Sequence, residues 1–377
     1  MPGRLVLFLL TALLLEGCAA IKWDISQVPK SRPDGLVTAA PNVGPEQAAK
    51  LRALVADAGA GKWGRVDSLL IMKDGKLVLE TYFRGNQWDH LHDLRSVTKS
   101  LLSAAYGAGI AHKLISSEDQ PVYELFEQTS RFSNPHPEKA LITAAHVMSM
   151  TAGLRCGDMG SATNPCGARL HASATPWRSK LQVPPWQRAL NLPLEHRPGT
   201  VFTYNDAAPV IMDAMISGIV GMETNEFLKL TLFRPMTFNP RSNLHRLTAR
   251  DMAKFGQLYL NGGIWNGKRL LLKRWIETST SMQWTFPDTD NKKGYGFFWW
   301  ISEVDVNGAG HRMFCALGNG GQAIFVVPSQ QLVFVTTAAN YDDTTRQNAP
   351  LQMLKQYVVP AFAMSPVPET TSAPAPN

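Results

Sequence analysis

The sequence lacks two motifs that would assign a hydrolytic mechanism directly. It has no Gly-x-Ser-x-Gly nucleophile elbow and no His-Glu-x-x-His helix of a zinc peptidase. His90-Leu-His92-Asp93 resembles part of a metallo-hydrolase motif, but the histidine that should follow at the right spacing is missing. We therefore expect no metal and no organic cofactor.

Clustered charge of one sign is also lacking. The chain has 37 basic and 30 acidic residues, a net charge of +7, with no run of five or six like charges and no aromatic residues interleaved with basic ones. This pattern is typical of a solvated surface, so we expect no nucleic-acid partner. With 45% hydrophobic residues and no internal repeat, the 377 residues can bury the core of one large domain or two medium ones.

Only one long apolar run occurs, at the start of the chain. Residues 1–17 contain Arg4 and then about a dozen apolar residues, which is typical of a secretory signal and short for a membrane span. The run ends in Leu-Glu-Gly-Cys, which resembles a bacterial lipobox with Cys18 as the lipid-modified residue, although Glu16 is unusual there. We expect an exported, periplasmic lipoprotein, anchored to the outer membrane because Ala19 does not resemble an inner-membrane retention residue. A plain cleavable signal is the alternative.

Cysteine is scarce, with four residues in the chain. In an oxidising compartment, Cys156 and Cys166 are candidates for a disulfide, because they bracket a loop rich in Gly, Asn and Pro. Cys315 lies in an apolar stretch and is interpreted as a buried small hydrophobe.

Strand patterns occur near both ends of the chain. Residues 67–83 form two β-rich runs around Asp74-Gly75, a strong hairpin signal, and further β-rich runs follow residue 294, the last two of them joined at 328–330. Helices and long loops dominate from about 115 to 290. We predict an α/β (α+β) fold, with one antiparallel sheet built from both chain ends, flanking helices and an inserted, mainly helical region.

Pro- and Gly-rich segments suggest the domain boundaries. Residues 18–45 are interpreted as a tether, 46–363 as the folded domain and 364–377 as a disordered Pro-rich tail. The domain is expected to begin with a helix over 46–60 and to end with one over 349–362.

The stretch from His92 to Ile110 places Ser96 three residues before Lys99 at the start of an apolar helical pattern. A serine hydroxyl is a poor nucleophile until a base takes its proton, and residues three apart share one helix face. The N–H groups and dipole at a helix start also suit a developing oxyanion. Alternatively, Ser96 or Asp93 caps the helix and Lys99 is solvated; this stretch alone leaves both open.

Other segments extend the pattern. Together with Leu94–Ser100, they resemble the serine β-lactamase-like hydrolases: class C β-lactamases, DD-peptidases, related esterases and above all the nylon-oligomer (6-aminohexanoate-dimer) hydrolase branch. The segments are HVMSMTAGL (146–154), RPGTVFTYND (197–206), RDMAKFGQLYLNGGIWNGKRLL (250–271), GYGFFWW (294–300) and ALGNGGQAIFVVP (316–328). The resemblance runs from about residue 64 to 362 and implies the β-lactamase/transpeptidase-like fold.

The resemblance also implies roles for individual residues. Ser96 matches the acylated nucleophile, Lys99 its partner, and Tyr204 the tyrosine that acts as general base or proton shuttle beside a cation such as Lys99. A backbone N–H in the glycine-rich turn would complete the oxyanion hole with that of Ser96. The candidates are Gly320, Gly321 and Gln322, with the last two preferred.

Two residues depart from the family pattern. Gly318 stands where β-lactamases and peptidases carry Lys or His, so the cation that grips a substrate carboxylate is missing. Asp206 stands in place of an Asn; it could pair with Lys99 or be a turn residue. Both departures argue against efficient β-lactam hydrolysis and against a D-Ala-D-Ala peptidase.

We therefore expect an exported serine hydrolase that cleaves a small-molecule ester or amide through an acyl-enzyme on Ser96. The alternatives are a penicillin-binding, DD-peptidase or β-lactamase-type enzyme, or a non-catalytic envelope binding protein on the same scaffold. The sequence predicts neither the substrate's identity nor the oligomeric state.

Overall fold

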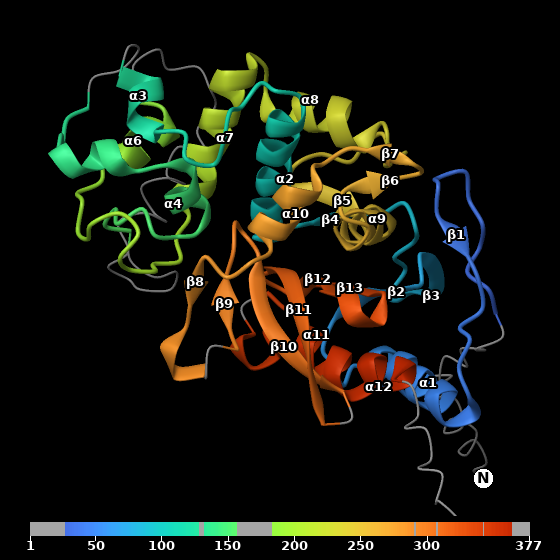
Figure 1. Ribbon diagram of the computed structural model, residues 1–377. Coiled ribbons are helices and arrows are strands. Elements are labelled where there is room, and N and C mark those ends of the chain that lie inside the picture. Colours follow the sequence, from blue (N-terminus) through green and yellow to red (C-terminus); the bar gives the residue numbers. More distant parts are fainter. Residues whose placement is uncertain are drawn as a thin grey trace, which may run out of the picture.

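A computed structural model describes most of the chain (Figure 1). The described residues are 27–127, 132–156, 183–289, 292–306, 308–341 and 343–363. The predicted signal peptide, Cys18, Cys166 and the predicted tail lie outside them.

The centre of the fold is a nine-stranded sheet. Its strand order is β1 (Val37–Thr38), β3 (Lys76–Tyr82), β2 (Val66–Lys73), β13 (Leu332–Ala338), β12 (Gln322–Val327), β11 (Ala309–Gly318), β10 (Trp300–Val306), β9 (Gly294–Tyr295) and β8 (Trp284–Thr285). Strands from the two ends of the chain meet where β2 pairs with β13. The prediction of a sheet built from both chain ends is confirmed.

The sheet is mixed rather than wholly antiparallel. The edge strand β1 pairs with β3 in parallel, with Val37 opposite Lys76. This strand comes from the segment predicted to be a tether, and that segment packs on the domain instead. The buried guanidinium of Arg250 explains why: it donates to Asp34 Oδ2, to the Lys30 carbonyl and, through two nitrogens, to both carboxylate oxygens of Glu80. Because this buried charge has partners both in the N-terminal segment and on β3, it holds the N-terminal segment against the sheet.

The turns follow from backbone chemistry. Asp74 and Gly75 both have positive φ, +50° and +76°, as a two-residue I′ hairpin between β2 and β3 requires. A 3-10 turn over Pro328–Gln330 joins β12 to β13. Both predicted hairpins are confirmed.

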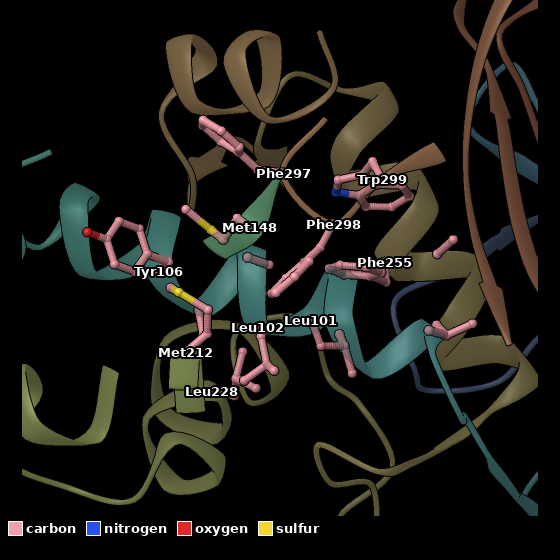
Figure 2. Packing of buried hydrophobic residues seen from close by; sticks show 14 of the residues in the cluster. Leu101, Leu102, Tyr106, Met148, Met212, Leu228, Phe255, Phe297, Phe298 and Trp299 are labelled. Carbon is pink, nitrogen blue, oxygen red and sulfur yellow. The ribbon is translucent and has the colours of Figure 1, made fainter. Parts of the chain in front are cut away.

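The stretch 294–300 is not one continuous strand. Residues 296–299 leave the sheet between β9 and β10, and Phe298 has a φ of +62°. The Phe298 N–H donates to the Met148 carbonyl and its carbonyl accepts from Ser100 Oγ. The segment departs from strand geometry because its aromatic side chains fill the core beside α2 (Figure 2).

Helices cover both faces of the sheet. One face carries α1 (Pro45–Gly59), α11 (Ala349–Met353), a π-helical turn (Leu354–Val358) and α12 (Val359–Phe362) (Figure 1). The other carries α2 (Val97–Ala111) and α9 (Ala249–Leu260). The helices predicted for 46–60 and 349–362 are thus confirmed.

The inserted region is mainly helical, as predicted. It contains α3 (Val122–Glu127), a 3-10 helix (Pro137–Leu141), α4 (Ala144–Met148), α6 (Pro185–Leu190), α7 (Ala207–Val220), α8 (Thr224–Leu228), a π-helical turn (Lys229–Phe233) and α10 (Lys273–Ser279). Two small ribbons pair β4 (Leu91–Asp93) with β5 (Arg246–Thr248), and β6 (Ile264–Trp265) with β7 (Lys268–Arg269). Among the described residues no single helix is long and apolar enough to span a membrane; α7 and Thr224–Phe233 pass that test only as a pair bent by 71°.

Helix α2 lies between the sheet and the inserted region, buried along nearly its whole length. Small residues make this possible: a Cβ on Gly107 would lie 2.2 Å from the Trp275 indole, and one on Gly109 2.5 Å from Ile115. Around the same helix, Leu102 packs toward Leu228, and Phe298 lies near Phe255 (Figure 2). Its N-terminus is therefore held in a fixed position.

Candidate active site

The N-terminus of α2 brings Ser96 and Lys99 together. Lys99 Nζ lies 3.1 Å from Ser96 Oγ, and the Lys99 side chain is only 5% exposed. Arg95, immediately before Ser96, has a φ of +50°, a conformation that residues with a side chain seldom adopt outside functional turns. The solvated lysine of the alternative interpretation is contradicted.

Asp206 and Tyr204 complete this cluster. Asp206 Oδ1 lies 3.1 Å from Lys99 Nζ, which answers the question that the sequence left open about this residue. Lys99 Nζ also lies 4.8 Å from the centre of the Tyr204 ring. The ammonium group therefore contacts a hydroxyl, a carboxylate and an aromatic ring, each from a residue that the sequence had singled out.

Asn205 fixes the turn that carries Tyr204 and Asp206. Its amide donates to the Thr203 carbonyl at 2.7 Å, and its side-chain oxygen accepts from the Ala208 N–H at 2.9 Å, in the first turn of α7. An Asn side chain that accepts from a helix N-terminus stabilises both the helix and the loop before it. Asn205 is buried, so its two neighbours project from a rigid turn.

The glycine-rich turn after β11 differs in detail from the prediction. A Cβ on Gly318 would lie 2.3 Å from the Leu94 carbonyl oxygen and 3.2 Å from Arg95 Cβ, so this residue meets the backbone leading to Ser96. The Gly321 N–H donates to the Gly318 carbonyl, which removes it as an oxyanion donor. Gln322 is buried in the ladder opposite Gly318, and its side chain donates to the Ala338 carbonyl.

Asn319 is the residue that the sequence analysis missed. It is exposed, it follows Gly318 directly, and no group in the described part of the chain accepts its N–H. The Ser96 N–H likewise has no acceptor among the described residues. By contrast, Gly320 packs against the Tyr341 ring. The end of a strand followed by a tight turn is the signal that could have pointed to Asn319, because the first residue past the ladder keeps a free N–H.

Two cysteines, Cys156 and Cys315, lie among the described residues. Cys156 is disulfide-bonded, and its partner lies outside the described residues. Cys315 is a free, buried thiol whose pKa burial raises to about 12. Over the described ranges no group of three or more His, Cys, Asp or Glu side chains could hold a metal ion.

Comparison of the sequence with known protein families identifies the family of this chain. The Beta-lactamase family model matches residues 51–356, which is most of the chain. The chain belongs to the beta-lactamase family. It is thus a member of a family of serine-hydrolase type, and the fold and family expected from the sequence are confirmed.

Individual relatives are distant. An uncharacterized protein of Alkalihalophilus pseudofirmus is 24% identical over 301 residues, covering 71% of this chain and 82% of that protein. Among solved structures, the "Putative 6-aminohexanoate-dimer hydrolase from Bacillus anthracis" has a TM-score of 0.63 at 21% identity, covering 80% of this chain and 79% of its own. EstCE1, described as a hydrolase with promiscuous acyltransferase activity, has a TM-score of 0.63 at 15% identity, covering 81% and 97%. These likenesses concern the fold.

His92 supports the segment that leads to Ser96. It lies on β4, buried, with Nε2 3.5 Å from Thr337 Oγ1 on β13. Burial lowers the pKa of His92 to about 4, although the Asp67 carboxylate acts in the opposite direction. The imidazole is therefore neutral in the folded protein at every pH above this value.

This burial predicts a pH dependence of stability. Between about pH 6.5, the usual pKa of an unfolded histidine, and pH 4, the unfolded chain binds a proton at His92 that the folded protein does not. The free energy of unfolding should therefore decrease as the pH is lowered from 6.5 to 4, and His92 should account for about 3 kcal/mol of this decrease. Urea unfolding at pH 7 and pH 4 should show a smaller loss for His92→Gln than for the wild type. The exposed His245→Gln is the control, and equal losses in all three proteins would contradict the assignment.

A second prediction concerns the close approach at Gly318. Gly318→Ala would push a methyl group into the Leu94 carbonyl and should destabilise the protein by about 1–3 kcal/mol. Gly218→Ala is the matched control, because a Cβ on Gly218 in α7 meets nothing within 4 Å. The urea concentration at the unfolding midpoint of each variant measures the difference. An unchanged midpoint for Gly318→Ala would show that Gly318 is not packed closely against the Leu94 carbonyl.

Proposed function

We propose that this protein is a serine hydrolase that cleaves an ester or amide through an acyl-enzyme on Ser96. The observation that carries the proposal is the position of Lys99 Nζ, 3.1 Å from Ser96 Oγ and 4.8 Å from the centre of the Tyr204 ring. Lys99 thus lies beside both a hydroxyl and a phenol, the two groups between which the proposed mechanism moves a proton. This is the arrangement that an activated serine nucleophile needs.

The proposed reaction requires Tyr204 to start as the phenolate beside Lys99, so that Ser96 Oγ attacks the substrate carbonyl carbon while its proton passes to the Tyr204 oxygen. The tetrahedral oxyanion lies between the N–H groups of Ser96 and Asn319. Collapse breaks the bond to the leaving group, which takes the proton from Tyr204 and departs. Water then attacks the acyl carbon, Tyr204 accepts a proton from it, and the released Ser96 oxygen takes that proton back.

The turn after β11 supports an ester or amide substrate over a β-lactam or a D-Ala-D-Ala peptide. No side chain fits at Gly318 without displacing the backbone before Ser96, so the cation that grips a carboxylate in those enzymes has no place there. The names of two structural neighbours, a "Putative 6-aminohexanoate-dimer hydrolase" and a "hydrolase with promiscuous acyltransferase activity", agree with a hydrolase that works by acyl transfer.

Hydrolysis of p-nitrophenyl acetate and butyrate tests the proposal. We expect Ser96→Ala to abolish enzymatic turnover, and Lys99→Met and Tyr204→Phe each to lower kcat/KM by roughly 10²–10⁴-fold, the range for loss of a general acid–base group. A fluorophosphonate should add one adduct to the intact wild type and none to Ser96→Ala. The exposed Ser116→Ala is the control and should behave as wild type.

Unchanged ester turnover in Ser96→Ala would refute the nucleophile. Absence of both turnover and adduct in the wild type would favour a binding protein on this scaffold. Nitrocefin hydrolysis as fast as that of a β-lactamase would contradict the substrate class.

We also propose that the protein is exported and lipid-anchored through Cys18. The disulfide at Cys156 supports an oxidising compartment. Fractionation of cells that express the full chain should recover it with the outer membrane, whereas Cys18→Ala should release it from the membrane fraction. Recovery of both proteins in the cytosol would contradict export, and recovery of both in the soluble periplasm would contradict the anchor.

A further inference from the structure

A strip of aromatic rings lies beside Tyr204. Trp300, the first residue of β10, stacks on the Tyr204 ring with centroids 5.5 Å apart and planes at 26°. Phe286 stacks on Trp300 at 6.3 Å, and Phe202 meets Phe286 edge-on at 5.1 Å. Trp284 of β8 stacks on Phe202 at 6.3 Å. We call the four rings of Phe202, Trp284, Phe286 and Trp300 the aromatic strip.

The strip is partly exposed, unlike the aromatic core next to it. All four side chains are of intermediate exposure, and so is Tyr204. Beneath them, the fully buried Tyr295 contacts Tyr204 at 6.1 Å, Trp300 at 4.8 Å and Phe202 at 5.4 Å, which holds the strip in place. Trp299, the neighbour of Trp300, is buried in the core. The two neighbouring tryptophans therefore differ in position: Trp299 belongs to the core, whereas Trp300 lies beside Tyr204.

Contiguous half-exposed rings on a rigid support are typical of a ligand surface. Their continuity with Tyr204 indicates which part of a substrate they meet. In the proposed reaction, Tyr204 returns its proton to the leaving group, so the leaving oxygen or nitrogen must come within hydrogen-bond reach of the phenol. The carbonyl oxygen is held elsewhere, between the Ser96 and Asn319 N–H groups. Atoms attached to the leaving group then lie next to Trp300.

We propose that the aromatic strip binds an aromatic leaving group, so that the enzyme prefers esters or amides of aryl-substituted alcohols or amines. This inference rests on the proposed function and specifies its substrate class. A planar ring can pack against the half-exposed rings of the strip in the stacked or edge-on geometries that aromatic pairs favour, which an aliphatic ring of the same size cannot do. The stacking advantage over plain burial corresponds to about a 2- to 12-fold gain.

Three acetate esters with leaving alcohols of similar basicity test this inference: ethyl, cyclohexylmethyl and benzyl acetate. All share one acyl group, so kcat/KM differences report on the leaving-group side. We expect benzyl acetate to exceed cyclohexylmethyl acetate by roughly 3- to 10-fold, and both to exceed ethyl acetate. Equal kcat/KM for the benzyl and cyclohexylmethyl esters would overturn an aromatic site, and equal values for all three would overturn any site at the strip.

Phe286→Leu keeps apolar bulk but removes one ring of the strip, without touching Tyr204, Lys99 or Ser96. It should lower the benzyl to cyclohexylmethyl ratio of kcat/KM toward one. Phe202→Leu is a second variant with the same expectation. Phe362→Leu, a half-buried ring in α12 on the opposite face of the sheet, is the matched control and should keep the wild-type ratio.

The failure of this inference and the failure of the proposed function look different. If no ester is cleaved and the fluorophosphonate adds no adduct at Ser96, the proposed function fails and the inference falls with it. If esters are cleaved through Ser96 but the ratio stays the same in Phe286→Leu and Phe202→Leu, only the inference is refuted.

Discussion

The burial of α2 is the constraint on which the site depends. This helix is enclosed by the sheet on one side and the inserted helices on the other, so its small residues lie against Trp275 and Ile115 with no room for a side chain at Gly107 or Gly109. Lys99 is enclosed with it. A buried ammonium needs partners, and the described ones are Ser96 Oγ and Asp206 Oδ1. The packing that stabilises the fold thus also directs the lysine toward the serine.

A second contact, between Gly318 at the end of β11 and the Leu94 carbonyl, determines which groups the strand end can offer to a substrate. The strand end at Gly318 approaches the Leu94 carbonyl closely enough to exclude any side chain, and it places the free N–H of Asn319 next in the chain. Both features follow from the position at which β11 ends: no cationic side chain fits at Gly318, and the Asn319 N–H lies just beyond the ladder. In the proposed reaction this strand end supplies a backbone donor to the substrate carbonyl, and Gly318 itself supplies no cation for a carboxylate.

Sequence reasoning succeeded where local chemistry decides the structure. Asp74-Gly75 specifies its turn through positive φ angles, and the spacing of Ser96 and Lys99 specifies a shared helix face. It failed where distant segments decide. The strand β1 depends on Arg250, two hundred residues away, and the proposed oxyanion donor, the Asn319 N–H, depends on where β11 ends. Trp300 could not be separated from Trp299 by sequence, since only the turn at Phe298 sends one to the core and the other to the site.

Charge balance around Ser96 links these features to substrate choice. Lys99 is balanced by Asp206 at 3.1 Å, and Arg95, the other cation adjacent to the serine, pairs with Asp93 at 3.3 Å and lies 4.8 Å from the Tyr341 ring centre. An anionic substrate would compete with Asp206 and Asp93 for these cations, whereas a neutral one would not. The aromatic strip adds apolar surface on the Tyr204 side. Paired charges and an adjoining surface of aromatic rings support the proposed preference for neutral, aromatic esters and amides over substrates that carry a carboxylate.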